Sequence, residues 1–259
     1  MKSKTLIRKL YKKFPLSIAK KYHDHTGCML NTHKEEFNKI ILCLDVTKKV
    51  VEEAINNNVD VIISHHPFLY GKKKYILATN DYKKELYDKL FLNNISVYSF
   101  FTNFDEAKDG MNDALASLLE LNDITPIEDI PMARKGYLTK PMEIHEFSKY
   151  ALEKLSLDYG QLISNGKQYI SSVAIIGGSG SSNAIKALNE GIDIFLSGDT
   201  PYHIRKELQE RNLNYLHVDH EIEVAFCNQM KKILLSFDKN LDIKIVNDVK
   251  QIELIILFV

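Results

Sequence analysis

Short apolar runs alternate with amphipathic segments along this chain, and this alternation constrains the fold more than any other feature. The strands predicted in the first half are KIILCLDV (39–46), VDVIIS (59–64) and ISVYSF (95–100). Between them, TKKVVEEAINNN (47–58) and a stretch that ends near Asn94 have helical periodicity, with Thr47 as the N-cap of the first helix. Strands that alternate with helices predict an α/β fold with a mostly parallel sheet covered by helices.

The second half repeats this pattern at an offset of 133 residues. The offset aligns Asp60 with Asp193 and Ser64 with Ser197, and it brings NNNVDVIISHHPF into register with LNEGIDIFLSGDTPY. Strand, turn and helix lengths agree between the halves, which predicts two related α/β lobes with mostly parallel or mixed sheets.

The boundary between the lobes is predicted in NDITPIEDIPMARKGYLTKP (122–141), because three prolines and two short polar turns are typical of a linker. The first lobe would comprise residues 1–126, completed by terminal strands within 236–259, and the second lobe residues 127–235.

Composition restricts the class of protein. The formal net charge is zero, which argues against nucleic acid and anionic membranes as partners. The longest apolar run, LIILFV, is too short to span a bilayer. The three cysteines, Cys28, Cys43 and Cys227, have no metal-like spacing and suggest reduced thiols, so we expect a cytoplasmic protein.

Polar residues follow the predicted strands where each strand ends. They are His65, His66, Thr102, Asn103, Asp105, Asp199, His203, Asp219, His220, Glu221 and Glu223. Ligands of open parallel sheets bind beyond the carboxyl ends of the strands, and histidines with carboxylates are the ligand set of a hydrolytic metal site. Each piece alone has a plainer interpretation: the His65-His66 doublet as a strand-end turn, Asp105 as a helix cap, and HDHT (23–26) as a solvated loop. Their occurrence together favours a metal site.

The segment GGSGSS (177–182) follows a strand and opens a helix. The backbone N–H groups of Gly177, Gly178, Ser179 and Gly180 are therefore candidates to hold a phosphate. The segment lacks the Lys-Thr/Ser ending of a P-loop, and a tight turn that needs glycine is the alternative.

Five blocks occur in a specific order, namely ISHHPF, TNFDEAKDGMNDALA, AIIGGSGSS, FLSGDTPYH and VDHEIE. In this order they resemble the signature of the NIF-three-like family, whose members are often labelled GTP cyclohydrolase 1 type 2 homologues. The resemblance covers nearly the whole chain, without the domain that some members insert between the lobes.

The resemblance implies a toroidal homohexamer with a dinuclear metal site in the cleft between the lobes. Carried over by position, the ligands are His65, His66, Asp105, His220 and Glu223. The cofactors would be two divalent ions per chain, with zinc, iron, manganese and nickel all compatible with such ligands. This chain departs from the family at Phe101, where His is frequent, and at Asp219, where Gly is frequent, and Glu221 competes with Glu223 as the carboxylate ligand.

These residues together with the resemblance predict a metal-dependent hydrolase with Glu223 bridging the metals. The family label implies a nucleotide such as GTP as its substrate. Glu221 or His203 would act as general base, and the glycine segment would hold the phosphates. One alternative is a non-catalytic metal-binding or regulatory hexamer, since a shared fold does not establish a shared reaction. Another is nucleic-acid binding in the ring through Lys- and Tyr-rich segments such as YGKKKY (70–75), although a solvated surface explains these segments better at zero net charge.

Overall fold

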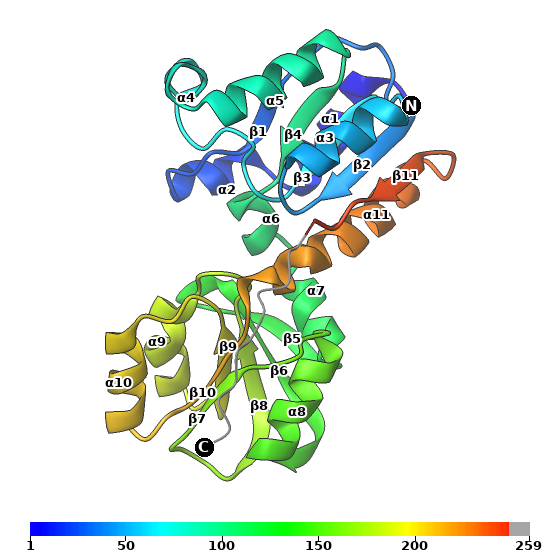
Figure 1. The fold of residues 1–259 in the computed structure, drawn as a ribbon. Coiled ribbons are helices and arrows are strands. Elements are labelled where there is room, and N and C mark those ends of the chain that lie inside the picture. Colours follow the sequence, from blue (N-terminus) through cyan, green and yellow to red (C-terminus); the bar gives the residue numbers. More distant parts are fainter. Residues whose placement is uncertain (249–259) are drawn as a thin grey trace.

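The computed structural model describes residues 1–248 and contains two sheets, each covered by helices (Figure 1). In spatial order, the first sheet consists of β1 (Gly27–Leu30), β4 (Ser96–Ser99), β3 (Val61–Ser64), β2 (Lys39–Cys43) and β11 (Asp242–Ile245). The second consists of β5 (Asn122–Ile127), β6 (Ile130–Glu143), β8 (Tyr169–Ile175), β9 (Ile194–Ser197), β10 (Asn214–His217) and β7 (Gln161–Ser164). Both sheets are mixed. In the first, β4, β3, β2 and β11 are parallel and β1 is antiparallel at one edge. In the second, the parallel strands β8, β9 and β10 have antiparallel neighbours on both sides. The predicted α/β class is confirmed.

The helices before β5 are α1 (Ser3–Lys13), α2 (Leu16–Lys21), α3 (Lys48–Asn56), α4 (Lys73–Thr79), α5 (Asp81–Leu92), α6 (Thr102–Glu106) and α7 (Met111–Leu118). Those after β6 are α8 (Ile144–Lys154), the 3-10 helix η1 (Ser181–Asn183), α9 (Ala184–Asn189), α10 (Tyr202–Glu210), the 3-10 helix η2 (His220–Val224) and α11 (Ala225–Phe237). Thr47 caps α3 as predicted, since its hydroxyl accepts a hydrogen bond from the Val50 N–H at 3.3 Å. Within residues 1–248, no helix has the length and apolar character needed to cross a membrane.

The internal repeat predicted from the sequence is visible in the hydrogen bonds at the start of the parallel strands. Asp60 precedes β3 and accepts the backbone N–H groups of Asn38 and Lys39, each at 2.9 Å. Asp193 precedes β9 and accepts the N–H groups of Ser171 and Ser172, also at 2.9 Å. A carboxylate at the same place in both sheets ties the start of one strand to its parallel neighbour.

The segment predicted as the lobe boundary forms a β-hairpin. Residues 122–127 and 130–143 are β5 and β6, and β6 pairs with both β5 and β8. The three prolines fit this hairpin because Pro126 lies on an edge strand, Pro131 at the start of β6, and Pro141 within a shift of register against β8. Prolines at these positions are compatible with the hairpin because the ladder is already interrupted or unpaired there.

The division into domains stays a prediction, and two strands bear on it. Strand β5 ends at the predicted boundary but belongs to the second sheet, whereas β11 pairs with β2 at the edge of the first sheet. The rest of the predicted terminal strands, 249–259, lies outside the described residues.

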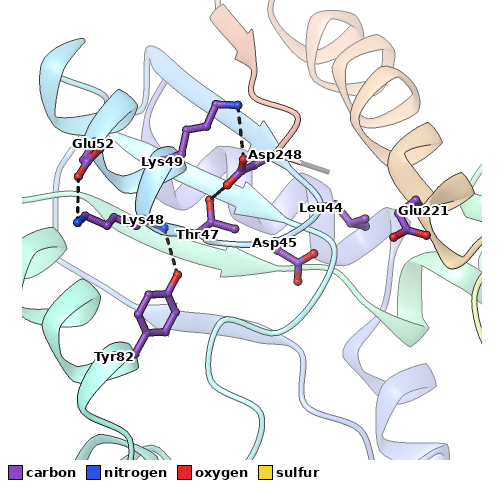
Figure 2. A pocket seen from close by; sticks show the side chains of 9 residues that line it. All are labelled: Leu44, Asp45, Thr47, Lys48, Lys49, Glu52, Tyr82, Glu221 and Asp248. Atoms are coloured by element: carbon purple, nitrogen blue, oxygen red, sulfur yellow. Dashed lines mark hydrogen bonds and ion pairs between the residues drawn. The ribbon is translucent and has the colours of Figure 1, made fainter. Parts of the chain in front are cut away.

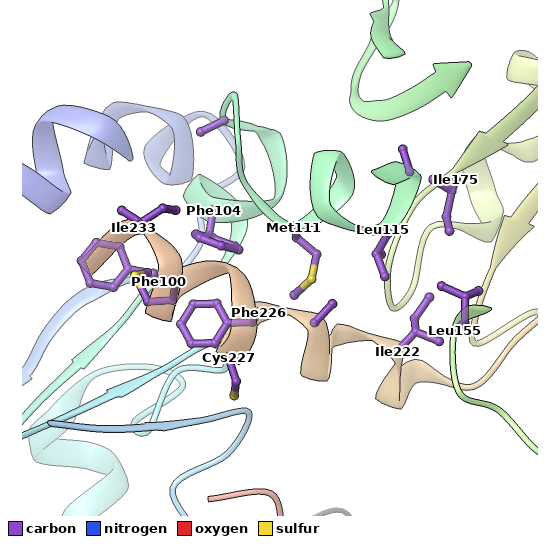
Figure 3. Packing of buried hydrophobic residues seen from close by; sticks show 14 of the residues in the cluster. Phe100, Phe104, Met111, Leu115, Leu155, Ile175, Ile222, Phe226, Cys227 and Ile233 are labelled. Atoms are coloured by element: carbon purple, nitrogen blue, oxygen red, sulfur yellow. The ribbon is translucent and has the colours of Figure 1, made fainter. Parts of the chain in front are cut away.

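One hydrophobic core runs from the first sheet into the second (Figure 3). Phe104 of α6 meets Phe226 of α11 edge to face, with ring centroids 4.9 Å apart. Met111 and Leu115 of α7 and Ile222 of η2 continue the same cluster toward β8. Because packed interiors transmit displacement, this core fixes the carboxyl ends of the two sheets relative to each other.

Candidate metal centre

Three histidines and two carboxylates gather beyond the carboxyl ends of β3, β4 and β10. His65 and His66 directly follow β3, and Asp105 lies on α6, after β4. His220 and Glu223 lie on η2, after β10, where residues three apart in a 3-10 helix stand one above the other. The sequence therefore predicted correctly that these strand ends meet.

Glu223 lies at the middle of this cluster, with only 3% of its surface exposed. Its Oε2 is 2.9 Å from His66 Nε2, 3.0 Å from His220 Nε2 and 3.5 Å from His65 Nε2. These distances place Glu223, rather than Glu221, among the imidazoles. His65, His66 and Glu223 offer ligand atoms close enough to share one metal ion.

A separate acceptor fixes the far nitrogen of each imidazole. His65 Nδ1 donates to the Phe100 carbonyl at 2.8 Å. His66 Nδ1 is 2.9 Å from Asp45 Oδ1, and His220 Nδ1 is 2.6 Å from Asp199 Oδ2. Such partners orient metal-binding histidines and leave Nε2 as the ligand atom.

Sequence reasoning missed two of these partners, Asp45 and the Phe100 carbonyl. Asp45 is the last but one residue of the predicted strand 39–46 and comes after the observed β2, so its place at a strand end was the available signal. The Phe100 carbonyl could not be predicted as a partner, because every residue has a backbone carbonyl and the residue type does not indicate its contacts.

Two buried atoms in the cluster lack a hydrogen-bond partner within residues 1–248, namely His65 Nε2 and Asp105 Oδ1. They lie 3.5 Å apart and face each other. Buried polar atoms in proteins nearly always have a partner, so each unsatisfied one requires an explanation. An imidazole nitrogen and a carboxylate oxygen are ordinary ligands of a divalent transition metal, so the residues present fit such an ion.

The electrostatics of the cluster are those of a compact anionic site. Burial lowers the pKa of His66, but hydrogen bonds to Asp45 and Glu223 outweigh it and raise the pKa to about 10. The Glu223 hydrogen bond raises the pKa of His220 to about 9. Burial raises the pKa of Asp105 to about 7. A cation bound here would compete with protons for the imidazoles, since metal ligands must be deprotonated.

The glycine segment forms a floor beneath Glu223. Gly178 has φ +59°, and a Cβ added to it would lie 2.4 Å from Glu223 Oε1. The N–H groups of Gly177 and Gly180 donate to Asn112 Oδ1 at 2.7 Å and Ser197 Oγ at 2.8 Å. The predicted phosphate contacts are therefore left to the N–H groups of Gly178 and Ser179 and stay a prediction.

The block TNFDEAKDGMNDALA holds Asp105 against the second sheet. Asn112, fully buried, donates to the Asp105 carbonyl at 3.2 Å and accepts from Gly177, which joins the two strand ends. A Cβ on Gly110 would lie 1.8 Å from the Phe104 carbonyl oxygen, so the turn between α6 and α7 requires glycine.

The remaining predicted residues lie around the cluster. Glu221 is half-buried on η2 and lines a cavity, whereas His203 is exposed in the first turn of α10 and is not among the described residues that contact Glu223. Phe101 packs against His65 and His66, with ring centroids 5.4 and 5.8 Å apart. An apolar ring thus takes the place beside the site where the family often has an imidazole.

The fold and this cluster define a mixed α/β protein of two helix-covered sheets with a candidate metal centre. The model of the Duf34/NIF3 (NGG1p interacting factor 3) family matches residues 1–251, and the chain belongs to this family.

Two curated relatives are named GTP cyclohydrolase 1 type 2 homolog. That of Clostridium perfringens is 30% identical over 203 residues, which cover 76% of this chain and 77% of the relative. That of Lactococcus lactis is 31% identical over 224 residues, covering 85% and 86%. A solved structure of a hypothetical protein from Staphylococcus aureus is 22% identical and shares the fold, with a TM-score of 0.85 over 95% of this chain and 96% of the other.

Proposed function

We propose that the protein is a dinuclear metal-dependent hydrolase that acts on a nucleotide-like substrate. The observation that carries this proposal is the position of Glu223 Oε2 among three imidazole nitrogens, next to two buried atoms that have no hydrogen-bond partner among residues 1–248. The name of the curated relatives, GTP cyclohydrolase 1 type 2 homolog, supports GTP as the first substrate to test.

Two groups of residues would hold the ions, in the cleft between the lobes. His65 Nε2 and Asp105 Oδ1 lie 3.5 Å apart, and the Nε2 atoms of His66 and His220 are 2.9 and 3.0 Å from Glu223 Oε2. Two divalent cations bound here would supply Lewis acidity and lower the pKa of a bound water toward neutrality. Zinc, iron, manganese and nickel all suit these ligands.

The chain's own residues would do the rest. Asp45 and Asp199 orient His66 and His220, and Phe101 and Phe226 exclude water from the side of the centre that they cover. Glu221 is the better placed of the two proposed general bases, because its side chain lines the cavity beside the centre. His203 stays a prediction of the sequence.

Turnover by metal-loaded protein tests the proposal. Protein loaded separately with zinc, manganese, iron(II) or nickel would be incubated with GTP and other nucleotides, and products followed by liquid chromatography and mass spectrometry. We expect one metal to support hydrolysis, and Glu221→Gln to reduce turnover about 10²- to 10⁴-fold without loss of metal. Glu128→Gln, an exposed change in the β5–β6 turn, is the matched control.

A non-catalytic metal-binding or regulatory protein is the alternative, and the deep burial of His65 and Glu223 favours it, since closed sites tend to be structural. Protein that holds metal but leaves every nucleotide intact would establish this alternative in place of the hydrolase.

The proposed assembly is a toroidal homohexamer, which rests on the family resemblance. Light scattering coupled to size-exclusion chromatography tests it, and a monomeric mass near 29.8 kDa at micromolar concentration would contradict it.

A further inference from the structure

A cavity of about 690 Å³ opens beside the candidate metal centre (Figure 2). Its lining residues are Leu44, Asp45, Thr47, Lys48, Lys49, Glu52, Tyr82, Glu221 and Asp248. It shares Asp45 with the centre, since this carboxylate both lines the cavity and orients His66. The volume of the cavity falls within the range of small-molecule sites. Because Asp45 lines the cavity and also contacts His66, a ligand in the cavity would lie next to the centre.

The two ends of the cavity differ in charge. Asp45 and Glu221 lie at the end next to the centre, whereas Lys48, Lys49, Glu52 and Tyr82 lie at the other, around the start of α3 (Figure 2). Glu52 Oε1 is 4.0 Å from Lys48 Nζ and partly balances the charge of this lysine. A cavity with separated charges orients a ligand that has one anionic end.

The chain's own carboxylate occupies the basic end. Asp248 accepts a hydrogen bond from Thr47 Oγ1 at 2.6 Å, and its second oxygen is 3.4 Å from Lys49 Nζ. Asp248 is placed there by the segment after β11, where the Val246 N–H donates to the Leu42 carbonyl at 2.9 Å. The side chains of Thr47 and Lys49 thus already bind an anion beside the centre.

We propose that this cavity is the substrate pocket of the centre, that it takes a phosphorylated ligand with its phosphate at Thr47, Lys48 and Lys49, and that Asp248 occupies the phosphate position until substrate replaces it. The part of the ligand rich in hydrogen-bond donors, such as a nucleobase, then points toward Asp45 and Glu221 and the reacting atoms. This inference rests on the proposed function, because it supplies the pocket for that reaction.

Binding of inorganic pyrophosphate to full-length, metal-loaded protein tests the inference by isothermal titration calorimetry. Asp248→Asn removes the competing charge and should tighten binding about three- to tenfold, and Lys49→Gln should weaken it by a similar factor. Lys39→Gln is the control. Lys39 is the first residue of β2, whereas the cavity lies beyond the last residue of this strand. All of these residues are at the surface or half-buried, and thermal unfolding would verify that each variant folds.

Pyrophosphate affinity that is the same in wild type, Asp248→Asn and Lys49→Gln would overturn the inference, since the probe would then bind only at the metals or elsewhere. Repeating the titrations in Glu223→Gln separates the two proposals. Lys49-dependent binding that persists there while metal-loaded wild type hydrolyses no nucleotide would remove the hydrolase alone. Nucleotide hydrolysis without any Lys49 dependence would remove the pocket alone.

Discussion

The two parallel-strand units of this protein share a backbone plan but end in different chemistry. Ile40 pairs with Val61 in the first sheet, and Val173 pairs with Ile194 in the second, each 133 positions further along. In both units an aspartate before the second strand accepts two backbone N–H groups of the first. The pairing of these strands and the aspartate that joins them are therefore the same in both sheets, whichever residues follow the strands.

The difference begins where the strands end. Asp45 and His66 contact each other in the first unit, and the positions equivalent to them in the second are Gly178 and Asp199. The first unit supplies imidazoles directly. The second supplies a glycine floor and an orienting carboxylate, which leave room for Glu223 to lie above Gly178. Of these two equivalent strand ends only the first carries proposed ligands, His65 and His66, whereas the proposed ligands of the second sheet, His220 and Glu223, follow β10.

The largest expected effect comes from filling the glycine floor. Gly178→Ala should reduce metal affinity at least about 100-fold, because its Cβ would displace the Glu223 carboxylate. Gly191→Ala is the control, since Gly191 also has a positive φ, +87°, but faces open space. Both variants should lose stability from backbone strain, and only the first should lose metal in competition with a chelator. Equal metal affinities in the two variants would contradict this role for Gly178.

The orienting carboxylates should matter less. Asp45→Ala and Asp199→Ala should each reduce metal affinity about 10- to 100-fold, because His66 and His220 lose the acceptors that fix their rings. Asp45→Asn, which keeps an oxygen acceptor, should cost less than Asp45→Ala. Chelator competition measures all three, and an unchanged affinity in both alanine variants would show that the rings are fixed by packing alone.

The shared aspartates should affect stability and leave the centre intact. Asp60→Asn and Asp193→Asn each weaken hydrogen bonds to two backbone N–H groups and should lower the free energy of unfolding by about 1–3 kcal/mol. The more buried Asp193 should give the larger effect. Urea unfolding measures the loss of stability. A fall in the metal content of either variant would contradict the expectation that these aspartates stabilise the strands without affecting the centre.

The smallest effect is a pH dependence from the same pair. Burial raises the pKa of Asp60, but Lys34 and the backbone N–H groups outweigh it, so the pKa is lowered. The pKa of Asp193 is lowered in the same way by Lys167 and the N–H groups of Ser171 and Ser172. A lowered folded-state pKa contributes stability above the ordinary carboxyl pKa, about 3.9, that is lost as pH falls through the folded value.

Urea unfolding at pH 6 and pH 3 measures this term, and Glu223→Gln as the background removes the contribution of the centre. The Asp60→Asn/Asp193→Asn double variant should lose less stability between these pH values than its parent. An identical loss in both would mean that other carboxylates carry the acid sensitivity.

Much of this arrangement could be predicted because it leaves periodic signals in the sequence. Apolar runs locate the central strands, and parallel neighbours bring the residues after their carboxyl ends to one edge, so His65 and Asp105 of the first sheet could be expected to meet. That His220 joins them depends on the edges of the two sheets facing each other. The 133-residue repeat could be detected in the sequence because Asp60 and Asp193 are the same residue type at equivalent positions, where each accepts two backbone N–H groups.

The rest depends on contacts between distant segments. The β5–β6 hairpin was not predicted, because Pro126 and Pro141 argue against strands unless they lie on an edge strand and in a register shift, which only the pairing reveals. The glycine segment was interpreted as a phosphate loop or a tight turn, and the phosphate contacts stay a prediction. Its close approach to Glu223, 45 positions after Gly178, could not be predicted from the sequence. The role of Asp45 required knowing which histidine lies opposite.

The most direct test is the metal content of wild type and Glu223→Gln by inductively coupled plasma mass spectrometry. Glutamine keeps the shape of the side chain and removes the charge that all three imidazoles share. The centre described here predicts about two transition-metal ions per chain in wild type and their loss in the variant. Wild type that stays metal-free after exposure to zinc, iron and manganese, or a variant that keeps its full metal content, would contradict it.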